Sequence, residues 1–259
     1  MSEGIDRQAA LRGPAAFFGL LGLFYIFFAD NAYRQYYVYT WLGGNGPSAA
    51  RNTCALLGSM ALSWGLFAGG IFAACWLFKL TAVELGWRKP AERLAAHVLP
   101  GAYLGLLAHV FNAWLVTGVL FLLQQGSLRA FYSFAWSSPG FSAVPTPFSA
   151  AALLNTAVIA PVMEELVFRG FIFRALSRRM DIRWSVLLTS VLFSLMHLSL
   201  NTIFLSGNAP WWVLNQFIYH FVSGLLFNVL LIRSRSLVAP ISAHIAYNLS
   251  TSFLLRTIS

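Results

Sequence analysis

Charged residues are scarce in this sequence, and acidic residues are scarcer than basic ones. Charged side chains make up 10% of the 259 residues, only eight residues are acidic, and 58% are hydrophobic. An ordinary soluble domain has about 25% charged residues, so this composition excludes that class. It is typical of an integral membrane protein, in which apolar helices of about 20 residues cross the lipid bilayer.

Cysteine is rarer still. The only two, Cys54 and Cys75, lie in one apolar run, where we expect them to pack as small hydrophobic residues rather than to form a disulfide or a metal site. The net charge is +9, but the basic residues form small clusters between apolar runs and no aromatic-lined basic groove. This pattern indicates membrane topology and argues against a nucleic-acid partner.

Most of the sequence is taken up by seven long apolar runs. They cover residues 14–29, 53–78, 95–123, 148–173, 184–205, 211–232 and 237–255. The sequence therefore predicts an all-α fold, a polytopic transmembrane bundle of about seven to eight helices. We expect one integrated membrane domain, with a variable N-terminal region at residues 1–147 and a C-terminal core at residues 148–259.

Arginine and lysine are distributed unevenly over the connections between these runs. The N-terminus and the connections after the second, fourth and sixth runs hold most of them, while the other connections hold three arginines between them. Because basic residues favour cytoplasmic loops, this distribution predicts a cytoplasmic N-terminus. The sequence contains fifteen arginines and only two lysines, and its loops are compact. Both features indicate a protein of a bacterial inner membrane.

Two adjacent glutamates, Glu164 and Glu165, are the only acidic residues inside an apolar run. Ionisable groups at membrane depth cost a few kcal/mol or more, so they mark a candidate functional site. Glu165 and Arg169 are four residues apart with the acid first, which favours an ion pair on one helix face. Glu164 is rotated by about 100° from Glu165, so we expect it to face the centre of the bundle as a general base towards water.

Two histidines on other runs reach a similar depth. At about 1.5 Å per helical residue, Glu164, His197 and His244 lie roughly 14 to 21 Å from their nearest cytoplasmic basic edges. Phe193 precedes His197 by four residues, so we expect its ring to pack beside the imidazole and fix its orientation. Asn248 follows His244 by four residues, and both side chains are expected to donate hydrogen bonds into one cavity, as an oxyanion hole requires.

Three spaced motifs carry a resemblance to a known family. They read Glu164-Glu165-x-x-x-Arg169, Phe193-x-x-x-His197 and His244-x-x-x-Asn248. Together they resemble the CPBP (Abi) family of intramembrane glutamic proteases, which includes the type II CAAX prenyl endopeptidases. The motifs cover about residues 150–252, and the first 145 residues carry no signature of the family.

The resemblance implies that the C-terminal core hydrolyses a peptide bond within the membrane plane. It implies that Glu164 and His197 activate water, and that His244 and Asn248 stabilise the tetrahedral oxyanion. Three residues would then support this set: Glu165, Arg169 and Phe193. The expected partners are the lipid bilayer and a membrane-anchored protein or peptide, cut near its C-terminal or anchored end, and a prenyl group on that substrate does not follow.

Several alternatives stay open. Glu164, His197 and His244 are a possible zinc ligand set with water in the fourth position, although the sequence has no HExxH pairing and Asn248 favours a mechanism without metal or other cofactor. Degenerate motifs would indicate a non-catalytic membrane immunity or scaffold protein, whereas these motifs are intact. A transporter with a proton-relay glutamate is a third alternative, but the sequence shows no internal repeat.

Four polar residues match no motif and are expected to form helix contacts: His109, Asn112, Tyr219 and His220.

Overall fold

The computed structural model describes residues 38–43, 48–77, 95–124, 153–198 and 210–257. Every regular element among these residues is helical and none is a strand, so the all-α prediction is confirmed for this part of the chain. The first predicted span, residues 14–29, lies outside the described residues. The transmembrane bundle of seven to eight helices stays a prediction.

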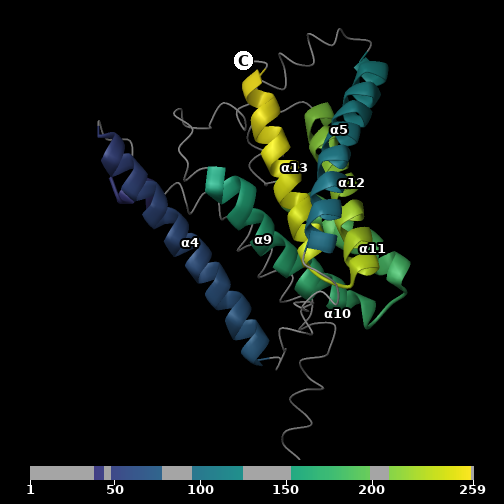
Figure 1. Cartoon of the computed structure of the whole chain (residues 1–259), viewed down its shortest axis with the longest axis horizontal. Helices are drawn as coiled ribbons and strands as arrows, with labels where there is room; N and C mark the ends of the chain where they lie inside the picture. The colour runs from purple at the N-terminus through teal and green to yellow at the C-terminus, as the bar shows by residue number, and fades with distance from the viewer. Residues whose placement is uncertain (1–37, 44–47, 78–94, 125–152, 199–209, 258–259) are drawn as a thin grey trace, which may run out of the picture. The chain divides into compact units, whose positions relative to one another are not determined.

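The chain divides into two compact units, residues 1–84 and 85–259. Helix α4 (Ala49–Leu77) belongs to the first unit. The second unit contains α5 (Ala95–Gln124), the segment 153–198, α12 (Pro210–Ser234) and α13 (Val238–Thr257). In this unit α13 lies beside α5, which belongs to the predicted variable region, and α12 contacts both (Figure 1).

The fourth predicted span is helical but changes its hydrogen-bond pattern along its length. Two π-helical segments, in which each N–H bonds the carbonyl five residues back, flank the helix that carries the two glutamates. The elements follow one another as η1 (Asn155–Ile159), α9 (Ala160–Glu165), η2 (Leu166–Ile172) and α10 (Phe173–Ser177). Such π segments occur frequently at functional sites.

Helix α11 (Ile182–Met196) begins and ends at side-chain caps. The Asp181 carboxylate accepts a hydrogen bond from the Arg183 backbone N–H at 2.8 Å, which makes it the N-cap. At the other end, His197 was expected inside an apolar span but lies directly after the last helical residue. The reason is local: its ring Nδ1 lies 2.8 Å from the Phe193 carbonyl, and its backbone N–H bonds Ser194 three residues back.

Close approach of α5 to α13 depends on two glycines of α5. A Cβ added to Gly101 would lie 2.6 Å from the Ala239 carbonyl oxygen, and one added to Gly105 would lie 2.8 Å from the Ala243 carbonyl carbon. Real Cβ atoms essentially never come under 3.0 Å. Small residues at this spacing let two helix backbones meet, as in glycine-spaced helix pairs of membranes.

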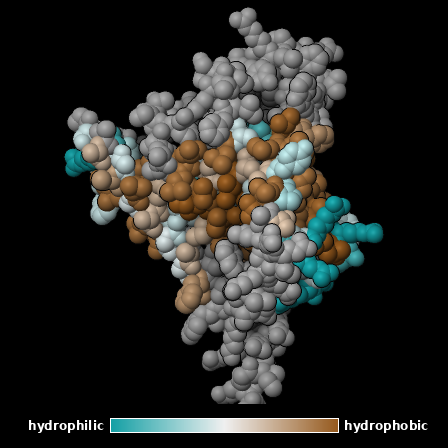
Figure 2. Space-filling model, viewed as in Figure 1, coloured by the Kyte–Doolittle hydropathy of each residue, from teal (hydrophilic) through white to brown (hydrophobic). Residues whose placement is uncertain are grey.

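Among the residues that the structure describes, two stretches are long and apolar enough to cross a membrane, Ala50–Gly70 in α4 and Gln216–Ser234 in α12. The second unit also exposes large apolar side chains on its helices, among them Tyr103, Phe111 and Trp184, each more than 60% exposed. Figure 2 shows this apolar surface in brown, with hydrophilic residues gathered where α10 meets α11.

We expect Gly105→Ala to destabilise the protein by about 1–3 kcal/mol, because the new methyl group overlaps the α13 backbone. The matched control is Gly65→Ala in α4, where an added Cβ meets nothing within 4 Å. There alanine should be neutral or stabilise by up to about 1 kcal/mol. Thermal unfolding of both variants in detergent measures the difference, and equal melting temperatures would contradict the packing described for α5 and α13.

Candidate active site

A buried ion pair lies at the centre of the second unit. Arg169 and Glu165 are both fully buried, and Arg169 Nη1 lies 2.8 Å from Glu165 Oε1. Arg169 Nη2 also donates to the Gly224 carbonyl of α12 at 3.2 Å. The ion pair predicted from the four-residue spacing is therefore confirmed, and it also ties η2 to α12. Breaking such a buried pair costs about 3–5 kcal/mol, since one charge stays behind without a partner.

Aromatic rings surround the Arg169 guanidinium. Its Cζ lies 4.5 Å from the ring centroid of Phe193, 5.2 Å from that of Phe227 and 5.9 Å from that of Phe168. Its Nε has no hydrogen-bond partner among the described residues, so cation–π contact with these rings takes the place of solvent. Because the guanidinium is planar and weakly hydrated, arginine suits this site better than lysine.

His244 joins the two glutamates. Its Nδ1 lies 2.9 Å from Glu165 Oε1, the same oxygen that accepts from Arg169. A carboxylate only accepts hydrogen bonds, so His244 Nδ1 carries the hydrogen. The other ring nitrogen, Nε2, lies 3.7 Å from Glu164 Oε2. The Phe227 ring stacks on the imidazole with centroids 4.7 Å apart and fixes its plane.

His197 faces the same glutamate from the C-terminal end of α11. Its Nδ1 lies 2.8 Å from the Phe193 carbonyl, which only accepts, so Nδ1 carries the hydrogen here too. Nε2 is left directed towards Glu164, with its nitrogen 3.7 Å from Oε2. The Phe193 ring lies beside the imidazole with centroids 4.7 Å apart, so Phe193 orients His197 through its carbonyl as well as its ring.

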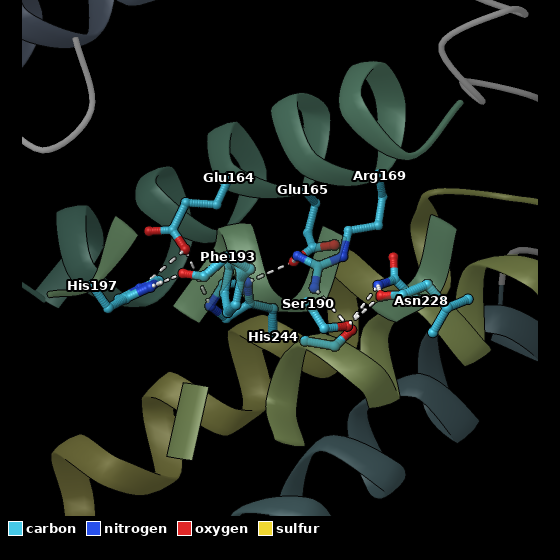
Figure 3. Close-up of polar contacts among 10 residues, drawn as sticks. Glu164, Glu165, Arg169, Ser190, Phe193, His197, Asn228 and His244 are labelled. Carbon is cyan, nitrogen blue, oxygen red and sulfur yellow. Dashed lines mark hydrogen bonds and ion pairs between the residues drawn. The ribbon is translucent and has the colours of Figure 1, made fainter. Parts of the chain in front are cut away.

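Glu164 therefore lies between two imidazole nitrogens, as Figure 3 shows. Its Oε2 is buried and has no hydrogen-bond partner among the described residues. The 3.7 Å separations exceed a hydrogen bond, but two atoms this far apart can each lie about 2.8 Å from one bridging water oxygen. The arrangement can hold and deprotonate a water, because a carboxylate and an imidazole lone pair both accept hydrogens.

Asn248 makes a contact that its spacing did not reveal. Its Nδ2 donates to the Thr156 carbonyl at 2.8 Å. In η1 the Ala160 N–H donates to the Asn155 carbonyl, five residues back. In the same pattern, the N–H of residue 161 would donate to the Thr156 carbonyl. Residue 161 is Pro161, which has no N–H, and the Asn248 amide supplies the donor instead. An amide nitrogen has two hydrogens, so the oxyanion role of Asn248 stays a prediction.

The polar residues outside the motifs make two different kinds of contact. His109 Nδ1 lies 2.9 Å from the Tyr219 hydroxyl, and Asn112 Nδ2 donates to the Tyr219 carbonyl and the Tyr247 hydroxyl at 2.7 and 2.8 Å. These residues tie α5 to α12 and α13, as expected of helix contacts. His220 instead stacks on His197. The motif spacing carries no signal of that contact, which depends on the pairing of α11 with α12.

Comparison with known proteins agrees with the motifs. Residues 146–250 match the family described as Type II CAAX prenyl endopeptidase Rce1-like. These residues are therefore similar to the CAAX proteases, and we call residues 146–250 the CAAX protease segment. No curated protein and no solved structure matches the chain. The CAAX protease segment contains the Glu164, His197 and His244 cluster, whereas α4 and α5 lie before it.

Metal binding was the alternative use of these side chains. Among the residues that the structure describes, no group of three or more His, Cys, Asp and Glu side chains is arranged to hold a metal ion. Whether Glu164, His197 and His244 bind zinc is a question for the chelator experiment below.

The hydrogen bond from Asn248 to the Thr156 carbonyl predicts a coupling between Asn248 and Pro161 that a double-mutant cycle measures. In the wild-type background, Asn248→Ala removes an exposed hydrogen bond to Thr156 and should cost about 0.5–1.5 kcal/mol of unfolding free energy. In the Pro161→Ala background the restored N–H serves Thr156, so the same change should cost less, by about 0.5–1 kcal/mol. Denaturant unfolding in micelles gives the four values, and additive effects would contradict this account of Asn248.

Proposed function

We propose that the CAAX protease segment is the catalytic domain of an intramembrane endopeptidase that hydrolyses a peptide bond with a glutamate-activated water. The family match supports protease activity on a protein substrate. The observation that carries the glutamic mechanism is the buried Oε2 of Glu164, which has no hydrogen-bond partner among the described residues and faces two imidazole nitrogens at 3.7 Å. Leaving such an oxygen unsatisfied is costly, and a reacting water satisfies it.

In the proposed reaction, the water donates its hydrogens to Glu164 Oε2 and His197 Nε2. Its oxygen attacks the carbonyl carbon of the scissile peptide bond as one proton passes to the Glu164 carboxylate. The carbonyl oxygen becomes an oxyanion. As the C–N bond breaks, the proton passes from Glu164 to the leaving nitrogen, so the products are a carboxyl terminus and an amine.

His244 and Asn248 are the proposed oxyanion donors. His244 then needs a hydrogen on Nε2 as well as on Nδ1, which makes it an imidazolium. Glu165 stabilises this cation directly, since its Oε1 lies 2.9 Å from His244 Nδ1. With both carboxylates ionised, the charges of the two glutamates, Arg169 and His244 sum to zero, which limits the cost of burying them.

The proposed substrate is anchored in the bilayer. Two apolar stretches long enough to span a membrane and the exposed apolar side chains of α5 support a membrane setting. Arg178, Arg179 and Arg183 are exposed at the α10–α11 turn, and Arg233 and Arg235 at the α12–α13 turn. Because α11 and α12 pair antiparallel, both turns lie at one end, which suits the cytoplasmic side of a bacterial inner membrane.

The test uses the full chain in proteoliposomes with two quenched fluorescent probes. One probe is a lipid-anchored peptide with a cleavable C-terminal tail, and the other is a single-span peptide with the same tail. We expect the wild type to cut at least one probe and Glu164→Gln to lower kcat by about 10²–10⁴-fold, the usual contribution of a general base. Asp181→Asn is the matched control, since it makes the same change at an exposed carboxylate.

Undiminished cleavage by Glu164→Gln would remove the glutamic mechanism. Loss of wild-type activity with 1,10-phenanthroline, restored by added zinc, would instead support the zinc-dependent version of the protease. A membrane immunity or scaffold protein without hydrolytic activity would leave both probes intact in every variant.

A further inference from the structure

We infer that His220 is a positioning residue for His197. The two imidazole rings lie nearly parallel, at an interplanar angle of 14°, with centroids 3.7 Å apart. The other ring pairs at the site are wider, since the centroids of Phe193 and His197 and those of Phe227 and His244 are each 4.7 Å apart. His220 therefore covers one face of the imidazole that the proposed reaction uses.

His197 needs such support because of where it lies in the chain. It follows the last residue of α11, and its backbone N–H bonds Ser194 only three residues back. The side chain is 24% exposed. The Phe193 carbonyl holds Nδ1 and the tilted Phe193 ring lies beside the imidazole, but the ring can still pivot about Nδ1 because neither contact lies flat against its face. A flat ring against its face removes this freedom and keeps Nε2 directed at Glu164.

The pairing of α11 with α12 places His220 at this position. Asn228 Nδ2 donates to Ser190 Oγ at 3.0 Å, and a Cβ added to Gly224 would lie 3.1 Å from the Ser190 Cα. The helices thus approach closely over these small residues. His220 lies one helical turn before Gly224, while His197 lies seven residues, about two turns, beyond Ser190 and just past the end of the antiparallel α11. The two rings meet there face to face.

The role of the stack depends on ring shape rather than on the His220 nitrogens. Phenylalanine presents a flat ring of similar size, so His220→Phe should keep His197 in place, whereas His220→Ala removes the support. A misplaced catalytic group lowers the rate of the chemical step more than substrate binding. This inference rests on the proposed function, in which His197 helps to activate water.

The kinetic test measures kcat and KM for both His220 variants in the proteoliposome assay, using whichever probe the wild type cuts. We expect His220→Ala to lower kcat by about tenfold or more, with KM within about twofold. His220→Phe should stay within about threefold of wild type. Phe217→Ala is the control, because Phe217 lies on the same helix and stacks on Phe221 rather than on His197. Melting temperatures confirm that each variant is folded.

A second readout does not depend on protease activity. Diethyl pyrocarbonate modifies accessible imidazole nitrogens, and mass spectrometry after digestion gives the modification rate of His197. Release of the ring should raise this rate several-fold in His220→Ala, and His220→Phe should restore the wild-type rate. Phe217→Ala should leave it unchanged.

The results separate the inference from the proposed function. Wild-type kcat and wild-type labelling in His220→Ala would overturn the stack as a positioning contact, and so would a His220→Phe variant as impaired as His220→Ala. If His197→Ala cleaves the probe at the wild-type rate, the proposed mechanism fails, while the labelling rates still report on the ring contact.

Discussion

One carboxylate oxygen connects the parts of this site. Glu165 Oε1, fully buried, accepts from both Arg169 and His244. Through Arg169 it is tied to η2 and to the Gly224 carbonyl of α12, and through His244 it is tied to α13. A charge buried in this way is tolerated only while its partners stay in place. The same contacts therefore join α9, which carries Glu165, to η2, α12 and α13, and set the distance between His244 and Glu164.

The remaining geometry follows from local features of the backbone. The π segments on either side of α9 interrupt the regular series of backbone hydrogen bonds. Pro161 lacks the N–H that would donate one of these bonds. Asn248 supplies that donor to Thr156, which fastens α13 to η1. At the end of α11, the His197 ring bonds the Phe193 carbonyl, so the residue that ends the helix also directs its Nε2 towards Glu164.

Sequence spacing predicted the contacts that lie within one helix. The four-residue separation of Glu165 and Arg169 predicted their ion pair, and the rotation of Glu164 relative to Glu165 predicted different directions for the two carboxylates. Matching depths also predicted that Glu164, His197 and His244 approach one another. The contacts of His244 with Glu165, of Asn248 with Thr156 and of His220 with His197 depend on the register between helices, which spacing within one helix does not determine. The family match covers the motifs and not the first 145 residues.

Glu164 and His197 are proposed to hold a reacting water between them. The most direct measurement is an experimental structure of the full chain in lipid, at a resolution that shows ordered water, with anomalous scattering recorded at the zinc edge. We predict a water within about 3.2 Å of both Glu164 Oε2 and His197 Nε2, with no anomalous signal. A zinc ion at that position, or a separation beyond about 7 Å between the two side chains, would contradict the account.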